Sequence, residues 1–129
     1  MKMNVCVIDD DQIYQLIIRK AVERAGVYDS ICFYNDGSEA FEDLLNSKKV
    51  LPALILLDIN MPQMDGWQFL DGLIKHRPDF DRETTIYIVS SSIAFSDRTK
   101  AESYKQVSGF LSKPLSVEKL KEIALKHQK

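Results

Sequence analysis

The chain has 129 residues, a length typical of one globular domain whose core needs no disulfide or metal to hold it. Its net charge of -2 and the absence of a basic run give no electrostatic reason to expect a nucleic-acid partner. No apolar run approaches the roughly 20 residues of a transmembrane helix, and no signal peptide is visible, so we expect no membrane association and a cytoplasmic location. Cys6 and Cys32 lack metal-ligand spacing and are expected to be buried thiols.

Apolar runs and turn residues predict five strands that alternate with five helices. The strands are expected at Val5–Ile8, Ser30–Tyr34, Leu54–Leu57, Thr85–Val89 and, as a short strand, Phe110–Leu111. The Leu54–Leu57 run is apolar at every position, which is typical of a strand buried on both faces of a parallel sheet. The alternation indicates a parallel sheet covered by helices on both faces and joined by right-handed crossovers.

Apolar residues at helical spacing indicate which face of each helix points to the core. In the first helix, which Gly26 ends, we expect this face to consist of Ile13, Leu16, Ile17 and Ala21. In the later helices we expect Ala40, Phe41, Leu44 and Leu45; Trp67, Leu70, Leu73 and Ile74; Ala101, Tyr104 and Val107; and Leu120, Ile123 and Ala124.

Several polar segments are expected at helix ends or in solvent. Asp11, Ser96-Asp97 and Ser116 are expected to dress or cap the starts of helices. The segment 77–84 is charged and lacks a period, so we expect an exposed loop, and His127 is expected to face solvent.

Charged and hydroxyl side chains follow four of the five strands. Asp9 and Asp10 follow the first strand, Asp58 the third, Ser90 the fourth and Lys113 the fifth. Because the carboxyl ends of parallel strands share one edge of the sheet, these residues are expected to converge. Crowded carboxylates repel each other unless a cation neutralises them, and Mg²⁺ suits such oxygen ligands. A carboxylate beside a metal, an ammonium and a hydroxyl suits phosphoryl transfer through an acyl phosphate.

These motifs, taken in order, resemble those of a known family. The motifs are Ile8-Asp9-Asp10, Leu57-Asp58-Ile59-Asn60-Met61-Pro62, Met64-Asp65-Gly66, Ser90 and Lys113-Pro114. With them the chain resembles the receiver domain of two-component response regulators, in particular the single-domain chemotaxis regulators. The resemblance covers residues 1–129 and implies no output domain. It implies a flavodoxin-like, doubly wound five-stranded parallel sheet of order 2-1-3-4-5 with five helices.

The resemblance also implies roles for single residues. Asp58 would accept the phosphoryl group, which Ser90 and Lys113 would contact. Mg²⁺ would be held by the carboxylates of Asp9, Asp10 and Asp58 and by the backbone carbonyl of Asn60. Phe110 would be the switch aromatic. Ser90 stands where threonine is more frequent, and Ser91 stands where alanine is usual. Phe110 stands where the family usually has Tyr, His or Phe, and it has no hydroxyl for a partner contact. Phe110 alone is also consistent with simple core packing at a strand edge.

The implied function is signalling rather than enzymatic turnover of a substrate. The chain would take a phosphoryl group from a sensor histidine kinase or a histidine phosphotransfer protein. It would then bind a protein target through the surface of the fourth helix, fifth strand and fifth helix, as a monomer or weak homodimer. One alternative is a haloacid-dehalogenase-type phosphatase using Asp9 and Asp11, but the acidic pair expected for such an enzyme does not follow Lys113 at a strand end. Another is a flavin binder, in which the three acids after the first strand would repel phosphate.

Overall fold

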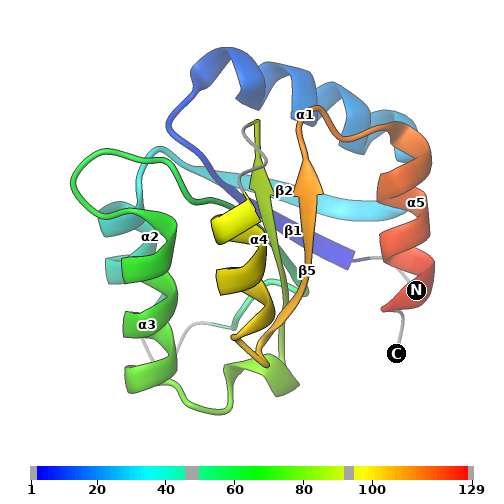
Figure 1. Ribbon diagram of the computed structural model, residues 1–129. Coiled ribbons are helices and arrows are strands. Elements are labelled where there is room, and N and C mark those ends of the chain that lie inside the picture. Colours follow the sequence, from blue (N-terminus) through cyan, green and yellow to red (C-terminus); the bar gives the residue numbers. More distant parts are fainter. Residues whose placement is uncertain (1–2, 46–49, 92–94, 128–129) are drawn as a thin grey trace.

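Five parallel strands form the central layer of the computed structural model, which describes residues 3–45, 50–91 and 95–127 (Figure 1). The strands are β1 (Met3–Ile8), β2 (Tyr28–Tyr34), β3 (Leu54–Asp58), β4 (Thr85–Ser90) and β5 (Val107–Ser112). All four pairings are parallel and the order is β2-β1-β3-β4-β5, so the predicted flavodoxin-like topology is confirmed. Every residue of β3 is buried, as its apolar run predicts.

Helices cover both faces of this sheet (Figure 1). They are α1 (Gln12–Ala25), α2 (Gly37–Leu44), α3 (Gly66–His76), α4 (Phe95–Glu102) and α5 (Val117–Lys126), with a short 3₁₀ helix η1 at Phe80–Arg82. Helices α1 and α5 pack together on one face, and α2 and α3 pack together on the other, on which α4 also lies. Each face therefore has its own apolar cluster, as expected for a doubly wound sheet.

The core face of α1 differs from the predicted one. The buried side chains at helical spacing are Tyr14, Ile18, Val22 and Ala25. Three of the four residues predicted to face the core are exposed instead, with Ile13 at 73%, Leu16 at 62% and Ile17 at 49% of full exposure. Both sets have helical spacing, so periodicity alone does not distinguish them. The consequence is an exposed apolar strip on α1.

Two segments around β5 and η1 were also predicted wrongly. Strand β5 has six residues rather than two, and Val107 pairs with Ile86 in the sheet instead of extending the α4 stripe. The segment 77–84 is not wholly exposed, because the Phe80 and Thr84 side chains are buried. Phe80 joins the cluster under α2 and α3, which gives this charged segment an apolar anchor.

Most predicted helix ends are confirmed. Asp11 caps α1 by accepting bonds from the amides of Ile13 and Tyr14, and Gly26 ends α1 at φ 69°. The Ser116 side chain likewise caps α5. Ser96 and Asp97 lie inside the first turn of α4, which begins one residue earlier, so they do not precede the helix as predicted.

The positions of Cys32 and His127 differ from the predicted ones. Cys6 is buried, but Cys32 is exposed because β2 is an edge strand, so the prediction of two buried thiols is wrong. His127 is half-buried and its Nε2 lies 2.7 Å from the hydroxyl of Tyr87, rather than facing solvent.

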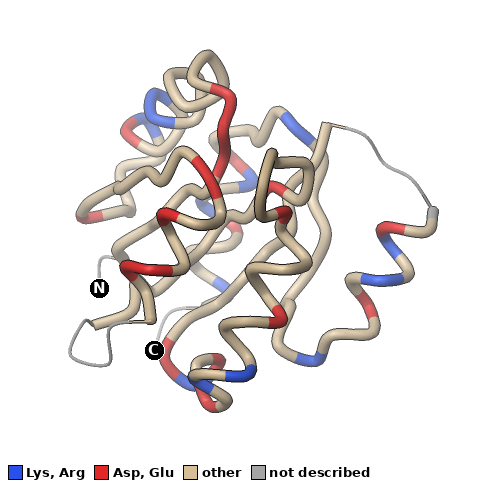
Figure 2. Tube along the Cα trace, turned by 90° about the vertical axis from the view of Figure 1, so that its left-hand side faces the viewer, with Lys and Arg blue, Asp and Glu red and all other residues tan. Residues whose placement is uncertain are grey.

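Lys and Arg are interspersed with Asp and Glu along the trace (Figure 2). Among the described residues, no helix combines the length and apolarity that crossing a bilayer requires.

Candidate functional site

The residues predicted to converge do lie together at the carboxyl edge of the sheet. Asp9 directly follows β1, Asp58 and Ser90 end β3 and β4, and Lys113 directly follows β5. Asp9, Asp58 and Ser90 are all buried, whereas Asp10 is exposed at the mouth of the site. The edge therefore holds two buried carboxylates next to one that solvent reaches.

Lys113 lies between the two buried carboxylates. Its Nζ is 2.6 Å from Asp9 Oδ2 and 3.6 Å from Asp58 Oδ2, so Asp9 rather than Asp58 is its closer partner. The backbone amide of Lys113 donates to the carbonyl of Ser90 at 3.0 Å, which ties the ends of β4 and β5 together. The contact of Lys113 with Asp58 is therefore the longer of its two contacts with carboxylates.

Asp58 is held in an environment that disfavours its charge. Burial, followed by repulsion from Asp9, raises the pKa of Asp58 to about 6, although the Asn60 amide and Lys113 act in the opposite direction. The Asn60 amide donates to Asp58 Oδ1 at 3.2 Å. The side chain of Asn60 also donates to Ser90 Oγ at 3.5 Å, a contact that the sequence did not suggest. Asn60 thus links the ends of β3 and β4.

Asp9 is fixed by local hydrogen bonds, whereas the Asp11 side chain caps a helix. Asp9 Oδ1 accepts from the amide of Asp11 at 2.9 Å, and Gln15 Nε2 donates to the Asp9 carbonyl at 2.7 Å. The Asp11 carboxylate accepts from two amides of α1, as a helix cap does. The arrangement therefore gives no support to a phosphatase site built from Asp9 and Asp11.

The turn after β3 requires glycine at one position. A Cβ on Gly66 would lie 2.7 Å from Ile59 Cα and 2.8 Å from the carbonyl oxygen of Asp58, closer than such atoms approach. Gly66 also donates its amide to the Ile59 carbonyl at 3.2 Å. Asp65 then starts α3 with a capping box that includes Gln68. The turn thereby packs directly against the backbone of Asp58.

The donor set fits a hard divalent cation. Asp9, Asp10 and Asp58 each offer a carboxylate oxygen, and these atoms all lie within 4.8 Å of one another. Carboxylate oxygens are the ligands that Mg²⁺ prefers, and a bound cation would relieve the repulsion that raises the Asp58 pKa.

Tyr14 is a neighbour of this site that sequence reasoning missed. Its ring lies beside Lys113, with Nζ 4.3 Å from the ring centroid. The signal that could have identified Tyr14 is the second apolar stripe of α1, which it begins.

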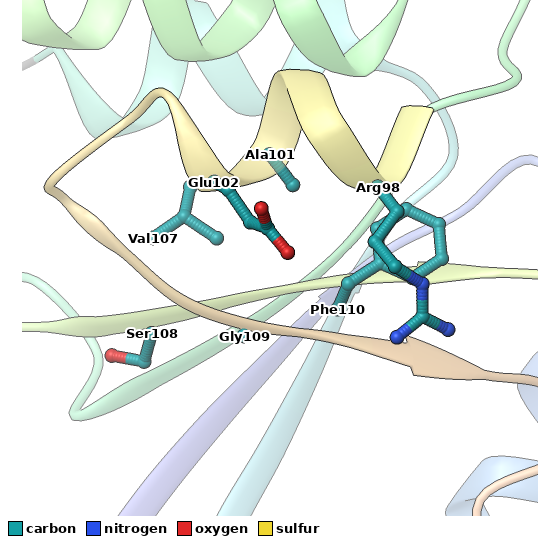
Figure 3. A pocket seen from close by; sticks show the side chains of 7 residues that line it. All are labelled: Arg98, Ala101, Glu102, Val107, Ser108, Gly109 and Phe110. Atoms are coloured by element: carbon teal, nitrogen blue, oxygen red, sulfur yellow. The ribbon is translucent and has the colours of Figure 1, made fainter. Parts of the chain in front are cut away.

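Phe110 borders a pocket between α4 and β5 (Figure 3). The pocket has a volume of about 190 Å³ and is lined by Arg98, Ala101, Glu102, Val107, Ser108, Gly109 and Phe110. The Phe110 ring is half-buried against the core cluster, and the Arg98 guanidinium lies over it, 5.5 Å from its centroid. Figure 3 shows these two side chains together at one end of the pocket. The Phe110 ring therefore packs against the core on one side and is partly exposed to solvent on the other.

Comparison with known proteins agrees with this architecture. The sequence profile of the response regulator receiver domain matches residues 5–125, and the chain belongs to that family. It is a receiver domain of two-component signalling, a class of module that generally signals rather than catalyses turnover. Members of the family bind Mg²⁺ in an acidic pocket and interact with histidine kinases or phosphotransfer proteins.

Individual relatives cover the chain to different extents. The probable methanogenesis regulatory protein FilR2 of Methanothrix harundinacea is 29% identical over 120 residues, which are 91% of this chain and 76% of that protein. The sensor histidine kinase CheAY of Helicobacter pylori is 31% identical over 116 residues, which are 90% of this chain but only 14% of that protein. Most of the length of CheAY therefore has no counterpart in this chain.

Solved structures show the same fold. A two-component response regulator from Cytophaga hutchinsonii has a TM-score of 0.90 at 29% identity, with 98% of this chain and 97% of that chain covered. A response regulator receiver protein from Dyadobacter fermentans has a TM-score of 0.84 at 25% identity, with 96% of each chain covered. Both likenesses extend over nearly the whole chain.

Proposed function

We propose that Asp58 accepts a phosphoryl group from a phosphohistidine of a sensor histidine kinase or histidine phosphotransfer protein. One observation carries this proposal. The buried Asp58 carboxylate ends β3 within 4.8 Å of ligand atoms of Asp9 and Asp10, and 3.6 Å from the Lys113 ammonium. This combination supplies a nucleophile, a cation site and a positive charge at one point.

The chemistry is a transfer between two nucleophiles. An oxygen of the Asp58 carboxylate attacks phosphorus, the O–P bond forms, and the N–P bond to the donor imidazole breaks. The product is an acyl phosphate on Asp58, whose added negative charge the Lys113 ammonium and the Ser90 hydroxyl would meet. Lys113 starts 3.6 Å from Asp58, and Ser90 is linked to the same site through Asn60. Later hydrolysis breaks the O–P bond and regenerates the carboxylate.

A magnesium ion would be held by the carboxylates of Asp9, Asp10 and Asp58 and by the backbone carbonyl of Asn60. When bound, Mg²⁺ would neutralise charge on the phosphoryl oxygens. Asp10 is the exposed member of the set, so it faces the side from which an ion enters. Asp9 is oriented by the Asp11 amide before any ion arrives, which reduces the ordering that binding requires.

The exposed apolar strip of α1, formed by Ile13, Leu16 and Ile17, is the proposed docking surface for the phosphohistidine donor. It begins three residues after Asp10, so a partner seated on it would lie beside Asp58. A groove lined by Gln12, Gln15, Leu16, Arg19 and Phe33 adjoins the strip. Exposed apolar side chains grouped beside a reactive site commonly mark a protein interface.

The output surface would be the face formed by α4, β5 and α5. We propose that Ser90 moves toward the phosphoryl group on Asp58 and that the Phe110 ring then moves from its place under Arg98 toward the core. The half-buried position of that ring, at the end of a pocket, supports two alternative positions for it. The downstream partner would be a cytoplasmic protein that distinguishes the two positions of the Phe110 ring.

Intact mass tests the central step. Incubation with acetyl phosphate and Mg²⁺ should add the mass of one phosphoryl group to the wild type and nothing to Asp58→Ala, and EDTA should abolish the addition. Asp29→Ala is a matched control, since Asp29 is exposed near the opposite end of the edge strand. An adduct that persists in Asp58→Ala, or its absence from the wild type, would refute the assignment.

A further inference from the structure

Tyr14 places a buried aromatic ring against the proposed phosphoryl site. Only 7% of Tyr14 is exposed, and Lys113 Nζ lies 4.3 Å from the centroid of its ring. The same nitrogen is 2.6 Å from Asp9 Oδ2 and 3.6 Å from Asp58 Oδ2. The ammonium is therefore bounded by two carboxylates and one ring.

Lysine needs such a boundary to hold one position. Its ammonium is a point charge on a flexible four-carbon chain, without the rigid fork that orients arginine. The ion pair with Asp9 attracts the charge but leaves other directions open. An aromatic face attracts a cation, most strongly where water is excluded, and the Lys113 side chain is only 12% exposed.

We propose that Tyr14 is a positioning residue for phosphoryl transfer, because its ring keeps the Lys113 ammonium between Asp9 and Asp58. This inference rests on the proposed function of Asp58. When the phosphoryl group arrives, the ammonium has a short path from Asp9 toward Asp58 and does not need to be ordered first. The ring thus lowers the reorganisation that the transfer requires.

The hydroxyl of Tyr14 can be separated from the ring in an experiment. It is buried and has no hydrogen-bond partner among the residues that the structure describes. A buried hydroxyl without a partner lowers stability, so packing alone would favour an apolar residue here. Tyr14→Phe keeps the ring and removes the hydroxyl, whereas Tyr14→Leu removes both.

Two measurements test the proposal on the full chain. In NMR spectra, the protons next to Lys113 Nζ should be shifted upfield by the ring in the wild type and in Tyr14→Phe, and should lose this shift in Tyr14→Leu. The rate of Asp58 phosphorylation by acetyl phosphate with Mg²⁺ should fall by about three- to thirtyfold in Tyr14→Leu. Tyr14→Phe should stay within about twofold of the wild type, since an aromatic face remains.

Tyr87→Leu is the matched control, since Tyr87 is buried in the same cluster as Tyr14 and contacts His127. Equal rates in Tyr14→Leu and the wild type would overturn the proposal, as would an equal loss in Tyr87→Leu or in Tyr14→Phe. If Tyr14→Leu does not fold, Tyr14→Met replaces it with the same expectations. A wild type that forms no adduct would refute the proposed function of Asp58. In that case the upfield NMR shift of the protons next to Lys113 Nζ still shows whether the Tyr14 ring holds the ammonium.

Discussion

Asp58 carries a charge in a place that solvates it poorly. Its pKa is raised to about 6 from the ordinary 3.8, first by burial and then by Asp9. A carboxyl group with a raised pKa binds its proton more tightly in the folded chain than in the unfolded chain. Its favourable contribution to stability is therefore full below pH 3.8 and is lost as pH rises through about 6. Without a cation, the ionised group destabilises the fold at neutral pH.

Asp58→Asn should consequently stabilise the metal-free protein at neutral pH. Because the variant has no charge at this position, we expect a gain of about 1–3 kcal/mol in the free energy of unfolding near neutral pH. Little gain is expected below pH 3.8, where Asp58 is protonated in the folded and unfolded chain alike. Urea unfolding in EDTA at several pH values measures this difference. Asp29→Asn, at an exposed site, should show no such pH dependence. A gain that does not depend on pH would contradict the stated cause.

At the residue scale, the sequence predicted which side chains meet but not how they pair. Asp9, Asp58, Ser90 and Lys113 converge because parallel strands share one carboxyl edge, which depends on topology alone. The preference of Lys113 for Asp9 depends on side-chain rotamers and on the ring of Tyr14, which lies on another element. Strand positions do not encode such distances.

At the scale of elements, α1 shows the limit of periodicity. Its two apolar stripes both have the spacing of a helix face, so either could be the core face. In the folded chain α1 packs against α5 and the sheet with Tyr14 inward and Leu16 outward, and this choice depends on the assembled cluster rather than on the helix alone. The extent of β5 was missed for a related reason, since its pairing with β4 rather than its composition makes it a strand.

The α1 strip gives a prediction about partner choice. Leu16→Asp should slow phosphoryl transfer from an autophosphorylated histidine kinase that serves as donor by about tenfold or more, because it buries a charge in the interface. The reaction with acetyl phosphate should not change, since that donor needs no docking surface. Leu125→Asp, at an exposed apolar position of α5, is the control that should transfer normally. Equal transfer rates for both variants would remove the strip from the interface.

The α4–β5 pocket gives a second prediction at this scale. Phe110→Ala should be phosphorylated within about threefold of the wild-type rate, because the Phe110 ring packs against the core cluster and Arg98 rather than forming part of the carboxylate cluster. The shifts that beryllofluoride, a phosphoryl analogue, induces in NMR spectra of α4 and β5 should shrink in this variant. Beryllofluoride-induced shifts of unchanged size would show that the ring takes no part in the switch.

At the scale of the whole molecule, the two cysteines report on cooperativity. Cys6 lies in the buried core of β1, paired in register with the exposed Cys32 of the edge strand β2. A thiol reagent should therefore label one thiol in the native protein and two in denaturant. The rate of labelling at Cys6 should follow global unfolding, since β1 is paired with both β2 and β3. Fast labelling of both thiols under native conditions would refute this.

The architecture of the whole chain was the most predictable level. A run of fully apolar residues such as Leu54–Leu57, flanked by helices at each side, has few arrangements other than a central parallel strand. Burial at η1 was less predictable, because Phe80 is a lone apolar residue in a charged segment and only the assembled cluster gives it a place.

One hydrogen bond, from the Lys113 amide to the Ser90 carbonyl, defines a short route from the candidate site to Phe110. It joins β4 to the strand that also carries Phe110, three residues before Lys113. The path along the chain from Lys113, whose ammonium lies 3.6 Å from Asp58, back to Phe110 is thus about 10 Å, at roughly 3.3 Å per residue. A reporter dye attached near β5 should therefore change its fluorescence when a phosphoryl group reaches Asp58.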